Sequence, residues 1–324
     1  MSNNVIYANS RISARETKLL DNEKLHRLLD CNTLSDAIKT LAEYGIGDGT
    51  ESDTDVILQK DREQLMSFVK ELKLDGAFIN AVLTKYDFHN VKVLMKAKYM
   101  RFTEYAHMLF PEYKYDVKRL AEKIKADDYT DVDPVLRDAL TSVDEAFANG
   151  SRNPKTIDII IDKAYYDYAV KKTKGDKLAR RYFAFEIFAL NTLTFLRARK
   201  MKLDVSEFKT QYIGERDETY LLFVDGYQKV DGMDGLIARY EHTDYGKLLR
   251  NINGLNVSDA EKIADDTLIK IVSGKKDDVF SEAKCVAYVL AREREQNAVN
   301  LILTSVKNKT DKAFVTQRLR GIDG

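Results

Sequence analysis

Two Glu-x-x-His pairs, Glu23–His26 and Glu104–His107, form the spacing in this 324-residue sequence that is most suggestive of chemistry. Helical di-iron bundles take their metal ligands from two such pairs, because a carboxylate and an imidazole three residues apart share one side of a helix. The pattern therefore raises the hypothesis of a helical di-metal enzyme.

The direction of these side chains argues against a metal centre, because ligands in a bundle must project inward. At about 100° per residue, Glu104 and His107 on a helix point away from the apolar side. Near the first pair, Glu23 lies opposite the core face and His26 lies beyond its edge. We therefore predict no metal site and keep the metalloenzyme as the least favoured alternative.

Nucleotide motifs are also incomplete. The glycine-rich stretch Gly45–Thr50 follows a helical pattern rather than a strand, and Thr50 stands where a dinucleotide fingerprint needs its last glycine. Gly274 and Lys275 lack the glycine five positions earlier that a P-loop requires, since Ile269 is there. We predict no bound nucleotide and no cofactor.

Nucleophilic catalysis has little support either. The sequence contains no G-x-S-x-G motif, and neither Cys31 nor Cys285 has a histidine near it in sequence. The two thiols are far apart and form no C-x-x-C pair, which is typical of ordinary thiols in a reducing compartment. The sequence therefore gives no motif for a nucleophilic catalyst, although residues distant in sequence could still meet in space.

Composition favours a helical, water-exposed protein. Only 3 prolines and 15 glycines occur, too few for the many tight turns of an all-β fold. Lys plus Arg and Asp plus Glu both number 52, so the net charge is zero. A strong sequence-independent nucleic-acid binder needs a basic excess, which is absent here.

The longest apolar run, Phe183–Leu196, contains Glu186 and Asn191, so we expect no spanning helix. Met1–Val5 lacks a basic region followed by an apolar run, and we expect no signal peptide.

Helical periodicity dominates the chain, and no stretch alternates with a period of two. Apolar residues recur every three or four positions between Asp21 and Leu41, and Glu23 stands in a first turn after Asp21. Ser258 with Glu261 predicts a capping box for a helix through Ile271. A final long helix is expected over 277–307. The predicted fold class is all-α.

Asparagines recur at about one third of the chain length. Asn90, Asn191 and Asn297 are 101 and 106 residues apart. A large apolar residue follows each of them four positions later, and a small residue seven positions later. The recurrence predicts three similar helical units over residues 1–110, 111–205 and 206–324.

Each of these asparagines shares a helix face with apolar neighbours, so we predict that all three are buried. A buried amide must find hydrogen-bond partners or cost about 1–3 kcal/mol. We assign Asn90, Asn191 and Asn297 a structural role, with backbone groups as the expected partners.

A basic cluster in the first two units is the other candidate site. It is a solvated face or a contact surface for an acidic partner. Its members are Lys96, Lys98, Arg197, Arg199, Lys200 and Lys202.

The opening segment Tyr7–Glu16, followed by Leu19 and Leu20, resembles the start of the C subunit of bacterial and archaeal V/A-type rotary ATPases, whose eukaryotic counterpart is the d subunit of the V-ATPase. The segments Leu34–Gly45, Asp87–Lys98 and Ala164–Arg199 are also similar to that family. The resemblance covers nearly the whole chain and is looser over 111–153 and 206–232.

The resemblance implies an all-helical, funnel-shaped protein of three units in a pseudo-threefold arrangement. It implies a non-catalytic subunit that links the central stalk to the membrane proteolipid ring, peripheral on the cytoplasmic face. ATP hydrolysis or synthesis, coupled to H⁺ or Na⁺ transport, then takes place in other subunits. The principal alternative is a different helical interaction scaffold, which explains the composition and repeat but not the ordered motifs.

Overall fold

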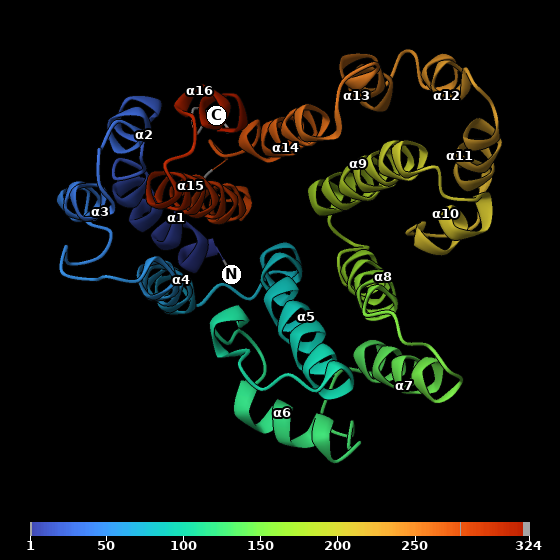
Figure 1. Ribbon diagram of the computed structural model, residues 1–324, viewed down its shortest axis with the longest axis horizontal. Helices are drawn as coiled ribbons and strands as arrows, with labels where there is room; N and C mark the ends of the chain where they lie inside the picture. Colours follow the sequence, from blue (N-terminus) through green and yellow to red (C-terminus); the bar gives the residue numbers. More distant parts are fainter. Residues whose placement is uncertain (1, 279, 320–324) are drawn as a thin grey trace. The chain divides into compact units, whose positions relative to one another are not determined.

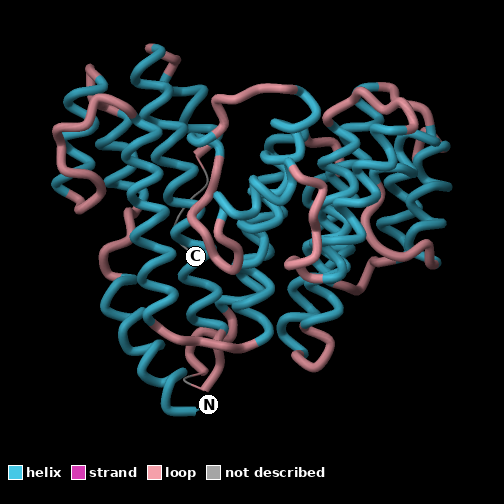
Figure 2. Tube along the Cα trace, turned by 90° about the horizontal axis from the view of Figure 1, so that it is seen from below, coloured by secondary structure: helices cyan, strands magenta, loops and turns pink. Residues whose placement is uncertain are grey.

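The computed structural model describes residues 2–278 and 280–319. Every regular element within those residues is helical, and no strand occurs among them (Figure 2). The all-α prediction is therefore confirmed.

Contacts between residues divide the chain into two compact units. The terminal unit comprises Met1–Asn80, Leu109–Tyr113 and Ile269–Gly324, and the middle unit comprises Ala81–Met108 and Lys114–Leu268. These units differ from the predicted sequence repeats at 1–110, 111–205 and 206–324. The three-repeat division stays a prediction.

The terminal unit is organised around one long helix, α15 (Ala283–Asn308), which contacts the four N-terminal helices and the last helix (Figure 1). Those surrounding helices are α1 (Ser2–Glu16), α2 (Asn22–Leu29), α3 (Leu34–Glu43), α4 (Thr54–Glu71) and α16 (Lys312–Arg318). Such a central position requires apolar residues on several faces, and α15 has them. Its buried residues include Val299, Ile302 and Leu303, which pack with Leu28 and Leu41.

The middle unit contains most of the remaining helices. They are η1 (Ala106–Met108), α6 (Val117–Lys125), α7 (Pro134–Ala148), α8 (Lys155–Lys172), α9 (Lys177–Met201), α10 (Val205–Gln211), α11 (Glu218–Gln228), α12 (Gly232–Arg239) and α13 (Asp244–Ile252). The chain leaves one unit and enters the other within two of its helices. They are α5 (Ala77–Met100) and α14 (Val257–Ser273).

Aromatic side chains form the core around α9, which contacts α8, α10, α11 and α13. Phe188 and Phe195 on α9 pack edge-on against Phe223 of α11, with ring centroids 5.5 and 6.2 Å apart. Phe208 of α10 stacks on Tyr227 at 4.5 Å. Burial of such large rings dominates the stabilisation of a core.

A row of polar and aromatic contacts joins α5 to α8. Lys92 pairs with Asp162 at 2.6 Å, and Lys96 pairs with Asp158 at 2.7 Å. One turn earlier, Phe88 packs against Tyr165. Residues four apart on α5 and three or four apart on α8 thus meet in register along one seam.

The three longest helices end in the same way. α5, α9 and α15 contain 24, 25 and 26 residues, and each is followed at once by a basic residue in the left-handed region. These residues are Arg101, Lys202 and Lys309, with φ of 57°, 56° and 51°. Left-handed backbone is uncommon for residues with a Cβ, so the three long helices share an unusual ending.

Three local predictions need correction. The helix assumed for Glu104 and His107 is absent: apart from η1 the segment is a loop, because Arg101 turns the chain out of α5. α14 begins at Val257 because Asn256, not Ser258, accepts from the Asp259 N–H. α15 begins at Ala283 rather than near Asp277.

Candidate functional site

Asn90 and Asn191 are both 1% exposed. The partner of Asn191 is backbone beyond α10: its Nδ2 donates to the Ile213 carbonyl at 2.8 Å, and the Ile213 N–H donates to its Oδ1 at 2.9 Å. One amide side chain therefore satisfies both polar groups of one peptide residue. We call such a contact a backbone clamp.

Asn297 is exposed, so the prediction of its burial is wrong. The helix ends explain the error. Asn90 and Asn191 both lie eleven residues before the left-handed residue of their helix, whereas Asn297 lies twelve before Lys309. The residue eleven before Lys309 is Ala298, which is 5% exposed. A shift of one residue rotates a side chain by about 100°, which carries Asn297 out to the surface.

On the other two long helices, α5 and α15, buried carboxylates accept hydrogen bonds from backbone N–H groups of other segments. The sequence pattern did not reveal these two acids. Asp87 of α5 is 1% exposed and accepts from the Lys114 N–H at 3.1 Å. Glu295 of α15 is 0% exposed and accepts from the Leu20 N–H at 2.6 Å. Both acids lie fourteen residues before the left-handed residue, one turn from the asparagine position. An alignment of the helices on these ends, rather than on asparagine, would have found them.

Lys96 and Lys98, predicted as interface residues, are engaged within the middle unit. Lys96 pairs with Asp158, and Lys98 pairs with Asp127 at 2.5 Å and with Asp144 at 2.8 Å. Burial alone would lower the pKa of Lys98, but its hydrogen bonds to the two carboxylates outweigh burial and raise that pKa. Both ammonium groups are thus at least partly neutralised inside the protein.

The four basic residues of the cluster around the end of α9 fall into two groups, two arginines with partners and two lysines without an ion pair among the described residues. Arg197 pairs with Glu261, and Arg199 donates to the Val230 carbonyl at 2.9 Å. Lys200 and Lys202 are exposed and make no ion pair with any described residue. Of the six predicted residues, Arg199, Lys200 and Lys202 have no carboxylate partner among the described residues, and of these three Lys200 and Lys202 are exposed.

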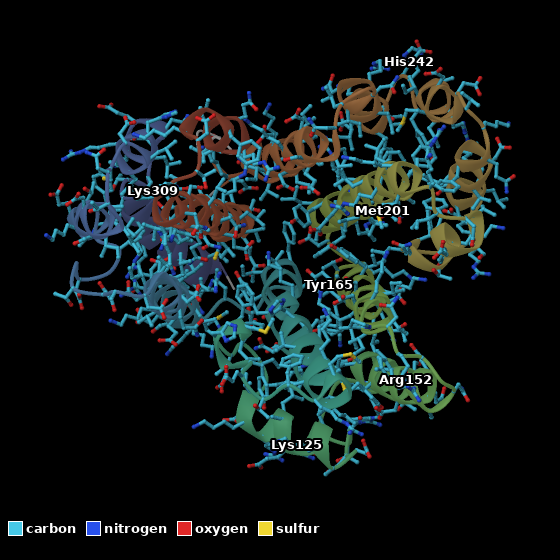
Figure 3. The ribbon with its side chains drawn as sticks, viewed as in Figure 1. Lys125, Arg152, Tyr165, Met201, His242 and Lys309 are labelled. Atoms are coloured by element: carbon cyan, nitrogen blue, oxygen red, sulfur yellow. The ribbon has the colours of Figure 1, made fainter. Side chains whose placement is uncertain are left out.

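Two exposed apolar side chains accompany these lysines. Met201, between them in sequence, is 65% exposed (Figure 3). Val230 is 95% exposed, and its backbone carbonyl accepts the hydrogen bond from Arg199. We call Lys200, Met201, Lys202 and Val230 the α9-end surface. Sequence reasoning found its lysines but missed Val230, which lies some thirty residues away.

The Glu-x-x-His pairs do not form a metal centre in the described part of the chain. Glu23, His26, Glu104 and His107 are all exposed. No group of three or more His, Cys, Asp or Glu suited to a metal ion occurs among the residues that the structure describes.

Comparison with known proteins decides the family. Residues 8–318 match the family described as ATP synthase (C/AC39) subunit. The chain belongs to the ATP synthase C/AC39 subunit family. This confirms the resemblance seen in the sequence, and it makes the chain a non-catalytic subunit of the rotary-ATPase type.

Curated relatives of this C/AC39 subunit align with it over most of their length. The C subunit of the A-type ATP synthase of Desulfurococcus sp. strain SY is 24% identical over 327 residues, covering 93% of this chain and 86% of that protein. The C subunit of the V-type sodium ATPase of Enterococcus hirae is 22% identical over 328 residues, covering 97% of both. The C subunit of the A-type ATP synthase of Thermococcus kodakarensis is 24% identical over 344 residues, covering 95% and 89%.

A spanning helix needs about 20 predominantly apolar residues. None of the helices formed by the described residues combines that length with that apolarity.

Proposed function

We propose that this C/AC39 subunit is the central-rotor adaptor of a V/A-type ATPase. It links the central stalk to the membrane proteolipid ring, and so couples ATP hydrolysis or synthesis to H⁺ or Na⁺ transport. It carries no active site and binds no nucleotide, metal or nucleic acid. It is peripheral, on the cytoplasmic face of the membrane.

The observation that carries this proposal is the match to the ATP synthase C/AC39 family over residues 8–318. The recurrence of a long helix closed by a basic left-handed residue agrees with the three-unit body that the family resemblance implies. Three similar units in a pseudo-threefold arrangement would place one opening for the stalk at their centre.

An adaptor of this kind needs two docking surfaces. We place one charged contact on the α9-end surface, because Lys200 and Lys202 have no ion pair with any described residue and flank the exposed Met201. Arg197 and Arg199 support that surface through Glu261 and Val230. Contacts of this type at a rim are electrostatic and are weakened by salt.

The proposal is tested in cells from which this chain has been deleted. We expect membranes from those cells to hydrolyse ATP, if at all, without ion transport, and the native chain to restore coupling. Purification of an affinity-tagged chain from membranes should recover stalk and ring subunits together. Normal ion pumping in the deletion strain would remove the adaptor role.

A further inference from the structure

The middle unit contains a groove, at the point where α5 ends, that none of the contacts above explains. It has a volume of about 350 Å³. Its walls come from the last turns of α5, the loop over 101–105 and one side of α6. We infer that this groove binds an acidic peptide segment of a neighbouring subunit, one that carries an aromatic or aliphatic side chain beside a carboxylate. The inference rests on the proposed function.

The floor of the groove is apolar. Leu94 and Ile124 are 3% and 1% exposed and close its base, while Ala97 and Ala121 leave room above them. On the loop side, Phe102 meets Tyr105 edge-on, with ring centroids 6.2 Å apart. Pockets that bind ligands are usually about 300–1,000 Å³ and largely apolar. This groove is at the small end of that range, which suits one or two side chains.

The charge of the groove has a single sign. The charged groups that line it are Lys98, Arg101 and Lys125, and no acidic residue does so. Lys98 is neutralised by Asp127 and Asp144, which do not line the groove. Arg101 and Lys125 are exposed and make no ion pair with any described residue (Figure 3 shows Lys125 on α6).

An apolar floor beside two uncompensated cations complements a ligand that is apolar and anionic at once. Arg101 adds a specific geometry, because its guanidinium binds a carboxylate through two parallel hydrogen bonds. Its backbone is in the left-handed region, so its position is set by the end of α5 rather than by a flexible loop. Among anionic apolar ligands we favour a peptide because the groove is open and small, and a subunit meets other chains along its surface.

Photo-crosslinking in the assembled complex tests the groove. A photoreactive phenylalanine derivative replaces Thr103, which lines the groove, or Lys118, which is exposed on α6 outside it. The tagged chain is purified with its complex after illumination, and crosslinked peptides are identified by mass spectrometry. We expect position 103 to label a segment of another subunit with Asp or Glu next to an apolar side chain, at a yield at least about fivefold above position 118.

Two variants test the chemistry. The double variant Arg101→Glu, Lys125→Glu should reduce the position-103 crosslink at least about fivefold, and Ala121→Phe should do the same by filling the groove. Lys309→Glu is the matched control, because Lys309 is also an exposed basic left-handed residue after a long helix but lies outside the groove. Circular dichroism of each variant checks that the fold is retained.

The outcomes separate this inference from the proposed function. A complex that contains this chain but gives no crosslink at 103, or labels lipid or a segment without acid, overturns the groove inference alone. A crosslink unchanged in the folded charge-reversal variant overturns it too. A chain that does not purify with stalk and ring subunits overturns the proposed function itself.

Discussion

The side chain of Asn191 and the backbone of Ile213 are joined by two hydrogen bonds of 2.8 and 2.9 Å, one in each direction. This contact holds the segment after α10 against the middle of α9, twenty-two residues earlier in the chain. Because Asn191 is 1% exposed, no water replaces it readily. On the other two long helices a buried acid, Asp87 or Glu295, accepts a hydrogen bond from one backbone N–H, of Lys114 or Leu20.

Replacing Asn191 by Leu should destabilise the protein by about 1–3 kcal/mol, because the N–H and C=O of Ile213 lose their partner while they stay partly buried. Urea unfolding followed by circular dichroism measures the change. Asn297→Leu is the control, since Asn297 is exposed, and it should change stability by less than about 0.5 kcal/mol. Equal losses in both variants would contradict the clamp.

Gly232 should not tolerate a methyl group. A Cβ on Gly232 would lie 1.7 Å from the Gly226 carbonyl oxygen, so α11 and α12 would have to separate. Gly235, in the same helix, has nothing within 4 Å of its Cβ position. We expect Gly232→Ala to lower the melting temperature and Gly235→Ala to raise stability by about 0.8–1 kcal/mol through helix propensity. A harmless Gly232→Ala would show that the two helices are not packed this closely.

Charge reversal at the α9-end surface should weaken assembly. Lys200→Glu with Lys202→Glu should reduce co-sedimentation of the chain with ring and stalk subunits, most visibly at low ionic strength. Reversal of Arg197 and Arg199 should also lower the stability of the isolated chain, because it breaks the contacts with Glu261 and Val230. Unchanged co-sedimentation of the lysine variant would remove this surface from the interface.

Acid should weaken the contact between α9 and α13. The hydrogen bond from Arg181 to Asp244, at 2.7 Å, lowers the pKa of that carboxyl. Because the folded pKa is depressed, the contribution is complete above the unfolded pKa of about 3.9 and is lost as the pH falls through the folded value. Both groups are well exposed, so about 0.2–1 kcal/mol is at stake.

Urea unfolding of Asp244→Asn at pH 7 and at about pH 2 measures this loss. The variant should be less stable than the native chain at pH 7 and nearly equal to it well below pH 3. Asp138→Asn, at an exposed acid with no ion pair among the described residues, is the control. A difference from the native chain that persists at low pH would contradict the assignment.

The two cysteines should differ in reactivity. Burial raises the pKa of the Cys285 thiol to about 12, and its side chain is 0% exposed, whereas Cys31 is half-buried. Since the thiolate is the reactive form, a thiol reagent at pH 8 should modify Cys31 in the folded protein and Cys285 only after unfolding. Rapid modification of Cys285 in the native protein would contradict the packing at the start of α15.

Much of the helical framework was predictable because its signals are local. Asp21 caps α2 as expected, its side chain accepting from the Lys24 N–H. The faces of Glu23 and His26 also followed from apolar spacing. The start of α14 was misplaced because Asn256 and Ser258 are both good capping residues, and the sequence does not say which one leaves the helix.

The ends of the long helices could not be predicted from the sequence, and the reason is physical. Glycine signals a left-handed helix end, but Arg101, Lys202 and Lys309 adopt that geometry with a Cβ. Without those ends as reference points, the asparagine recurrence aligned Asn297 where Ala298 belongs. The groove at Arg101 and the contact of Arg199 with the Val230 carbonyl depend on tertiary structure that no local pattern encodes.

The fixed ends of α5, α9 and α15 also imply where this protein tolerates insertions and deletions. Adding one residue inside any of these helices would turn every side chain between the insertion and the fixed end by about 100° relative to the preceding turns. Asn297 and Ala298 show how much one position matters, since one is exposed and its neighbour is 5% exposed. Single-residue length changes should therefore accumulate in the connections over 101–116 and 203–217, while the three long helices keep constant residue counts among related chains.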